Sequence, residues 1–121
     1  MGQSCPAHAT SSGKVLLAWA VALRLTDPLQ SFTPNTVTGV AELERELSVA
    51  RARGWASVSE ELEVGLNAVA APVYDHNAEV VAALSVSGPS YRLPESHFEE
   101  IAKVTIAAAD VISRRLGWIE S

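Results

Sequence analysis

The stretch of sequence that decides the fold is LNAVAAPVYDHNAEVVAALSVS, residues 66–87. It contains two apolar runs, residues 66–74 and 80–87, separated by residues 75–78, which are typical of a hairpin turn. The sequence therefore predicts two antiparallel strands joined by a short loop. Because nearly every position in both runs is apolar, both faces of this sheet are expected to be covered.

Three helices are expected to supply that cover. Apolar residues recur at helical spacing over residues 14–25, 40–53 and 95–116. The inward face of the third helix is expected to consist of Phe98, Ile101, Ile106, Ala109, Ile112 and Leu116. Residues 55–58 are expected to form a further short strand. This order of elements predicts a single α+β domain with helices packed on an antiparallel sheet.

Composition and charge exclude several classes of protein. The chain has 121 residues, of which 48% are hydrophobic and 19% are charged, which is typical of a globular domain. Its net charge of −5 opposes direct binding of nucleic acid. A single cysteine excludes an internal disulfide and favours a reducing compartment. No signal peptide or membrane-length apolar run is present, so the expected location is the cytoplasm, away from any membrane.

No group of residues predicts catalysis. Cys5 and His8 are only three positions apart in an irregular segment, and no acid is placed to orient the imidazole. Residues 11–14, SSGK, lack the glycine spacing of a phosphate-binding loop. The scattered histidines do not predict a metal site, and Glu60 and Glu61 are expected to form a solvated corner. We therefore expect no enzyme activity, no metal and no cofactor.

Two pairs of serines are candidate ligand contacts. Ser11 and Ser12 precede a helix, and a helix N-terminus offers free N–H groups that suit a small carboxylate. Ordinary helix capping is the alternative, and the residues alone leave both interpretations open. Ser85 and Ser87 are two positions apart, which places both hydroxyls on the same face of the expected strand.

The expected hairpin register places two small or apolar residues beside the strand serines. Val73 pairs with Val80 if the loop is four residues long. In this register Ala68 and Leu66 lie opposite the two strand serines, Ala68 opposite the first and Leu66 opposite the second. Two small or apolar positions and two hydroxyls would then form a patch suited to a mostly dry pocket.

Five segments of the chain, read in order, resemble the effector domain of the IclR family of bacterial regulators. They are PAHATSSGKVLLA at 6–18, FTPNTVT at 32–38, the helix and strand at 42–60, GLNAVAAPV at 65–73, and AALSVSGP with Arg92 at 82–92. Each motif alone would be weak, but together they cover nearly the whole chain.

The resemblance implies a GAF-like domain that binds a small effector, commonly an organic acid, and signals to a winged helix that binds operator DNA. It also implies assembly as a homo-oligomer, a dimer or a tetramer. The effector contacts that it implies are Cys5, Ser11, Ser12, Leu66, Ala68, Ser85 and Ser87. Relatives often carry an aspartate pair where this chain has Val58 and Ser59. Val58 therefore removes an anionic partner, and the expected ligand is a monocarboxylate with an apolar body.

The match begins inside the family's domain. We therefore expect the effector-binding domain at residues 1–121 to lack its first strands, and DNA to be bound only through a winged helix absent from this chain. An open sheet edge would also favour oligomer formation. The alternative is a stand-alone ligand-binding or dimerisation module that has lost the DNA-binding half.

Overall fold

The computed structural model describes residues 7–20 and 25–119 and confirms the α+β prediction. The elements, in chain order, are η1 (Ala7–Ala9), α1 (Ser11–Trp19), α2 (Val40–Arg53), β1 (Ala56–Ser59), β2 (Leu66–Tyr74), β3 (Val80–Pro89), η2 (Glu95–His97) and α3 (Phe98–Arg115). The three strands form an antiparallel sheet in the order β1-β2-β3. Helix α2 has the predicted bounds and ends at Gly54, whose φ of 91° suits the left-handed C-cap.

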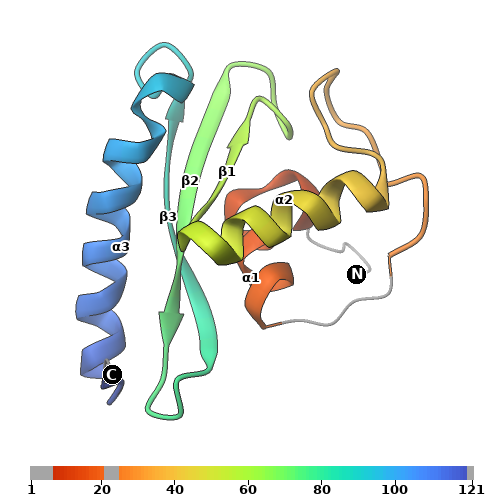
Figure 1. The fold of residues 1–121 in the computed structure, drawn as a ribbon. Coiled ribbons are helices and arrows are strands. Elements are labelled where there is room, and N and C mark those ends of the chain that lie inside the picture. Colours follow the sequence, from red (N-terminus) through yellow and green to blue (C-terminus); the bar gives the residue numbers. More distant parts are fainter. Residues whose placement is uncertain (1–6, 21–24, 120–121) are drawn as a thin grey trace, which may run out of the picture.

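The sheet lies between two helical layers (Figure 1), with α3 on one face and α1 on the other, while α2 packs against α1. The central strand β2 serves both layers. Val69 packs with residues of α3, whereas Ala70 packs with Val15 of α1 and Ala50 of α2. This alternation follows from the period of two along a strand, and it explains why β2 is apolar at nearly every position.

Strand β3 differs from the prediction that both faces of the sheet are covered. β2 is buried along almost its whole length, but β3 is exposed or half-buried throughout, with Val81 53% and Val86 40% exposed. The reason is its place at the edge of the described sheet, where the helices cover it only in part. An apolar run thus showed that β3 is a strand but not how deeply it is buried.

The hairpin register also differs from the prediction. The loop is five residues long, because the Asp75 N–H bonds to the Glu79 carbonyl, and a bulge follows at the start of β3. Val73 therefore pairs with Ala82 rather than with Val80. The shift is two residues from Ala82 onward, and side chains alternate with a period of two, so these residues keep their predicted face. Val80 stands before the bulge and pairs with Tyr74, so it lies on the face opposite to the predicted one.

Two helix details are corrected. Thr10, and neither Ser11 nor Ser12, is the N-cap of α1, since its backbone is extended and its hydroxyl accepts a hydrogen bond from the Gly13 N–H. α1 also begins earlier than predicted and ends at Trp19, while residues 21–24 of the predicted helix lie outside the described residues.

The buried face of α3 was predicted only in part. Phe98 and Ala109 are buried as predicted, and Ile101 and Ile106 are half-buried against the core. The residues that it buries are Phe98, Ala102, Thr105, Ala109 and Ser113, whereas Ile112 and Leu116 are 40% and 46% exposed. The prediction failed because two hydroxyls lie in the core, where both find partners. Thr105 donates to the Ile101 carbonyl at 2.7 Å, and the Ser113 hydroxyl accepts from the Tyr74 N–H at 2.9 Å.

Among residues 7–20 and 25–119, no helix is both long enough and apolar enough to cross a bilayer.

Candidate ligand pocket

A cavity of about 190 Å³ lies where the start of α1 meets the end of β1 and the strands β2 and β3. Its lining consists of Ala9, Thr10, Ser11, Ser12, Val58, Leu62, Leu66, Ala68, Ser85 and Ser87. Seven of the eight residues that the sequence analysis selected therefore line one cavity. The eighth, Cys5, lies outside the described residues.

The polar wall of the pocket is the N-terminus of α1. Ser11 is buried, with 2% of its surface exposed, and Ser12 is half-buried. The N–H groups of the first helical positions have no partner within a helix, and the helix dipole places a partial positive charge there. This end of the pocket therefore suits an anionic oxygen.

The two strand serines line the same pocket. Ser87 pairs with Ala68, and Ser85 pairs with Ala70. Both serines are exposed, so the pocket opens to solvent along β3. The small side chain of Ala68 on β2 leaves space for the cavity, and the two hydroxyls can donate to a ligand oxygen.

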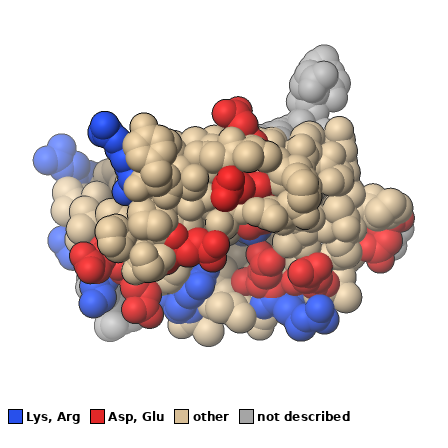
Figure 2. Space-filling model, turned by 90° about the horizontal axis from the view of Figure 1, so that it is seen from above, with Lys and Arg blue, Asp and Glu red and all other residues tan. Residues whose placement is uncertain are grey.

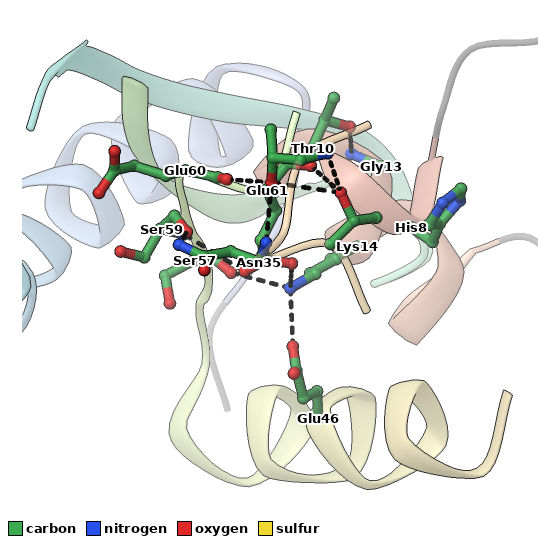
Figure 3. Close-up of polar contacts among 12 residues, drawn as sticks. His8, Thr10, Gly13, Lys14, Asn35, Glu46, Ser57, Ser59, Glu60 and Glu61 are labelled. Carbon is green, nitrogen blue, oxygen red and sulfur yellow. Dashed lines mark hydrogen bonds and ion pairs between the residues drawn. The ribbon is translucent and has the colours of Figure 1, made fainter. Parts of the chain in front are cut away.

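Lys14, one turn along α1 from its first residue, forms a buried ionic cluster (Figure 3). Its ammonium, in a residue only 2% exposed, donates to Glu46 at 2.7 Å, Glu61 at 2.8 Å and the Ser57 carbonyl at 3.2 Å. All three ammonium protons thus have an acceptor, which is the condition for burying this charge. The cluster ties α1 to α2 and to the end of β1.

Glu61 corrects the prediction of a solvated corner, because it is only 8% exposed. Burial raises the pKa of the Glu61 carboxyl, and the neighbouring Lys14 ammonium partly offsets this rise. The second carboxylate oxygen accepts from the Ser59 N–H at 3.2 Å. A pair of adjacent glutamates is usually solvated, so only the partner lysine 47 positions away could have indicated burial.

The sequence analysis missed three lining residues, Ala9, Thr10 and Leu62. Ala9 and Thr10 stand within a segment that resembles the family, so the signal for them was present. Leu62 follows the glutamate pair in a segment without periodicity and carried no signal.

His8 bonds to the Gln30 carbonyl through Nε2, at 2.6 Å.

A larger hollow of about 450 Å³ lies between α2, β1 and η2. Its charged lining mixes both signs, with Arg45 and Arg53 among Glu42, Glu46 and Glu95. Figure 2 likewise shows acidic and basic side chains interspersed over the face that it presents. Such a mixture gives no preference for a ligand of one charge. Among the described residues no group of histidine, cysteine and acidic side chains is placed to hold a metal ion.

The family model for the C-terminal part of the bacterial transcriptional regulator IclR matches residues 1–114. The chain belongs to the IclR family. It is 40% identical to the HTH-type transcriptional repressor AllR of Klebsiella pneumoniae, over 97% of this chain and 45% of that protein. It thus spans about half the length of the curated relatives that it matches. These relatives are transcriptional repressors rather than enzymes.

Solved structures of the IclR family share the fold. The IclR protein of Thermotoga maritima gives a TM-score of 0.82 at 37% identity, covering 93% of this chain and 47% of that one. The PobR inducer-binding domain from Acinetobacter, a double mutant in complex with 3-hydroxy benzoic acid, gives a TM-score of 0.78 at 28% identity. That match covers 93% of this chain and 68% of the PobR chain.

Proposed function

We propose that this IclR-family domain senses a small monocarboxylate for a DNA-binding transcriptional regulator. The observation that carries the proposal is the pocket itself, whose lining combines the N-terminus of α1, two strand serines and apolar side chains. Its 190 Å³ lies below the roughly 300–1,000 Å³ of pockets that hold drug-sized ligands, so we expect a small ligand. The complex of the PobR domain with an aromatic carboxylic acid supports this class of ligand.

The lining also argues against catalysis and against a polyhydroxylated ligand. Among the described lining residues the polar side chains are those of serine and threonine, and none is a histidine, cysteine, lysine or carboxylate. General acid–base chemistry needs such a titratable group within reach of the substrate. The apolar members Val58, Leu62 and Leu66 leave few partners for additional ligand hydroxyls. We therefore propose a binding role without catalysis or cofactor.

Calorimetry on this chain tests the proposal. Pyruvate, butanoate and benzoate serve as probes, and gluconate serves as the polyhydroxylated control. At least one of the three acids is expected to bind saturably with one site per chain, while gluconate gives no binding. Absence of saturable binding by all three acids would overturn the assignment of the ligand class.

Removing either strand hydroxyl is expected to weaken binding of the best probe acid. Ser85→Ala and Ser87→Ala should each cost about 1–3 kcal/mol of binding free energy, because each removes a hydrogen bond to a charged oxygen. Both serines are exposed, so the free energy of unfolding should hardly change. Ser96→Ala, at an exposed serine on η2, is the matched control. Unchanged affinity in both pocket variants would remove Ser85 and Ser87 from the site.

We also propose that the open edge of β3 leads this chain to form a homo-oligomer. β3 is ten residues long, lies at the edge of the described sheet and exposes Val81 and Val86. A long edge of this kind pairs readily with another chain. Sedimentation is expected to show at least a dimer, and Val81→Lys is expected to shift it toward the monomer. A wild-type chain that stays monomeric at every concentration would contradict this.

We assign operator binding to a separate part of a full-length regulator, in keeping with the acidic charge of this domain. A regulator of transcription works beside the DNA, and we therefore place this domain in the bacterial cytoplasm.

A further inference from the structure

Three consecutive backbone carbonyls, directly after the core of β1, accept hydrogen bonds from one distant loop. Asn35 donates to the Ser59 carbonyl at 3.3 Å. Thr33 donates to the Glu60 carbonyl, and Thr36 donates to the Glu61 carbonyl. We call Thr33, Asn35 and Thr36 the connector clamp. They form a compact turn, 25 to 27 positions away in sequence from the carbonyls that the two threonines hold.

The two threonine hydroxyls are fixed in direction by their own environment. Both residues are buried, with 7% and 8% of their surfaces exposed. The Thr36 oxygen accepts from the N–H groups of Phe32 and Thr33, at 3.0 and 2.9 Å, so its proton is left to point at the Glu61 carbonyl. A carbonyl buried without a partner is costly, so these contacts restrict where residues 60 and 61 can lie.

The segment that the clamp holds has an unusual backbone. Glu60 has a φ of 55°, a left-handed conformation that costs energy for a residue other than glycine. Its N–H bonds to the Leu66 carbonyl at 3.0 Å, and its carboxylate accepts from the Gly65 N–H at 2.7 Å. Figure 3 shows Glu60 beside Glu61, to which the Lys14 ammonium donates. These contacts together hold the backbone in a sharp bend at Glu60.

This bend sets one wall of the ligand pocket. Val58 and Leu62 stand on either side of the clamped residues 59–61, and both line the cavity. The connector clamp itself does not line the cavity, so it can act on a ligand only through the position of these two side chains. Moving the bend outward would widen the apolar part of the pocket and leave its four serines unchanged.

We propose that Thr33 and Thr36 are positioning residues that set the size selectivity of the effector pocket by holding the wall of Val58 and Leu62 in place. This inference rests on the ligand-binding function proposed above.

The test compares the affinity for benzoate with that for the larger naphthoate, by calorimetry on the full chain. Wild type is expected to prefer benzoate. Thr36→Val keeps the shape of the side chain but loses its donor, and the ratio of the two Kd values is expected to fall about tenfold, or about 1.4 kcal/mol. Thr36→Ser keeps the donor and is expected to retain the wild-type ratio. Thr33→Val provides a second variant should Thr36→Val not fold.

Thr105→Val is the matched control. Thr105 is equally buried, at 1% exposed, and its hydroxyl donates within α3 on the other side of the sheet. A mere loss of stability would move both Kd values together, so Thr105→Val should leave their ratio unchanged. A ratio that stays at the wild-type value in both Thr33→Val and Thr36→Val would overturn the selectivity role.

A readout without ligand separates this inference from the proposed function. Amide hydrogen exchange of residues 58–62 is expected to accelerate at least tenfold in Thr36→Val but not in Thr105→Val, which is about 1.4 kcal/mol of local protection. If wild type binds neither acid, the proposed ligand class fails while exchange still tests the clamp. Unchanged exchange in Thr36→Val would show that the clamp does not hold the wall, whatever the ligand.

Discussion

Replacing Lys14 with methionine is expected to lower the free energy of unfolding by about 3–5 kcal/mol at neutral pH, the usual cost of breaking a buried ion pair from one side. The substitution leaves the buried Glu61 carboxylate without its cation and the Ser57 carbonyl without its donor. A domain of this size is stabilised by only about 5–15 kcal/mol in total. Urea denaturation of wild type and variant at one pH measures the difference.

The size of this loss should depend on pH in a defined direction. Burial raises the pKa of Glu61 above its unfolded value, and Lys14 limits that rise, so Lys14→Met should raise the pKa further. A carboxyl whose folded pKa is raised costs most stability above that pKa. As the pH falls through it, the folded state takes up a proton before the unfolded state does, and the cost is relieved. The gap between wild type and variant should therefore shrink on acidification.

A double variant controls for the loss of the lysine side chain itself. Lys14→Met combined with Glu61→Gln removes both charges, and it is expected to recover most of the stability and to lose the pH dependence. Glu46 is 40% exposed in its side chain, so its own loss of Lys14 should contribute little. A gap that does not vary with pH, or a double variant no more stable than Lys14→Met, would mean that Glu61 does not carry the effect.

The arrangement of the sheet shows what periodicity can and cannot predict. The two runs at residues 66–74 and 80–87 were placed as strands because their length and flanking turn allow little else. The five-residue loop and the bulge could not be predicted from the sequence, since they depend on the hydrogen bond from the Asp75 N–H to the Glu79 carbonyl. The predicted pocket residues still share one face of the sheet, because the register from Ala82 onward shifted by an even number of residues.

Burial was harder to predict than element type. Exposed Ile112 and buried Ser113 are neighbours on α3, and hydrophobicity ranks them in the wrong order. Ser113 is buried because the Tyr74 N–H needs an acceptor at that point, which no local pattern reveals. In the same way, the Glu61 carboxylate can be buried because the buried Lys14 ammonium pairs with it.

The candidate site was predictable because its chemistry lies in short segments. A serine pair before a helix and a serine pair on one strand face can each be recognised locally, although only the fold brings them to the same cavity. The segment of the connector clamp lies within the motif at 32–38, but its role could not be recognised, because that role comes from contacts made across 24 to 27 positions. Leu62 carried no local signal at all. Sequence patterns thus revealed the serines of the pocket and Val58, but not Leu62 or the contacts that hold this wall in place.

Gly13→Ala is expected to abolish measurable binding of the best probe acid and to destabilise the domain by about 1–3 kcal/mol, as overpacking of a tight contact does. A Cβ at this position would overlap the backbone of Ala7 and the hydroxyl of Thr10. Backbone atoms cannot relieve the overlap by rotating about side-chain bonds, so η1 would have to move away from α1. That movement would displace Ala9 and Thr10, which line the pocket, and would break the bond from the Gly13 N–H to the N-cap Thr10.

The matched control for Gly13 is Gly88→Ala on β3, where an added Cβ would meet no atom within 4 Å. This variant should bind the probe acid as wild type does and should unfold at a similar urea concentration, because alanine fits an ordinary strand without strain. If both glycine variants lost binding alike, the effect would not come from contact between η1 and α1. If Gly13→Ala bound the acid normally, the close approach of Ala7 to α1 would not be what shapes this end of the pocket.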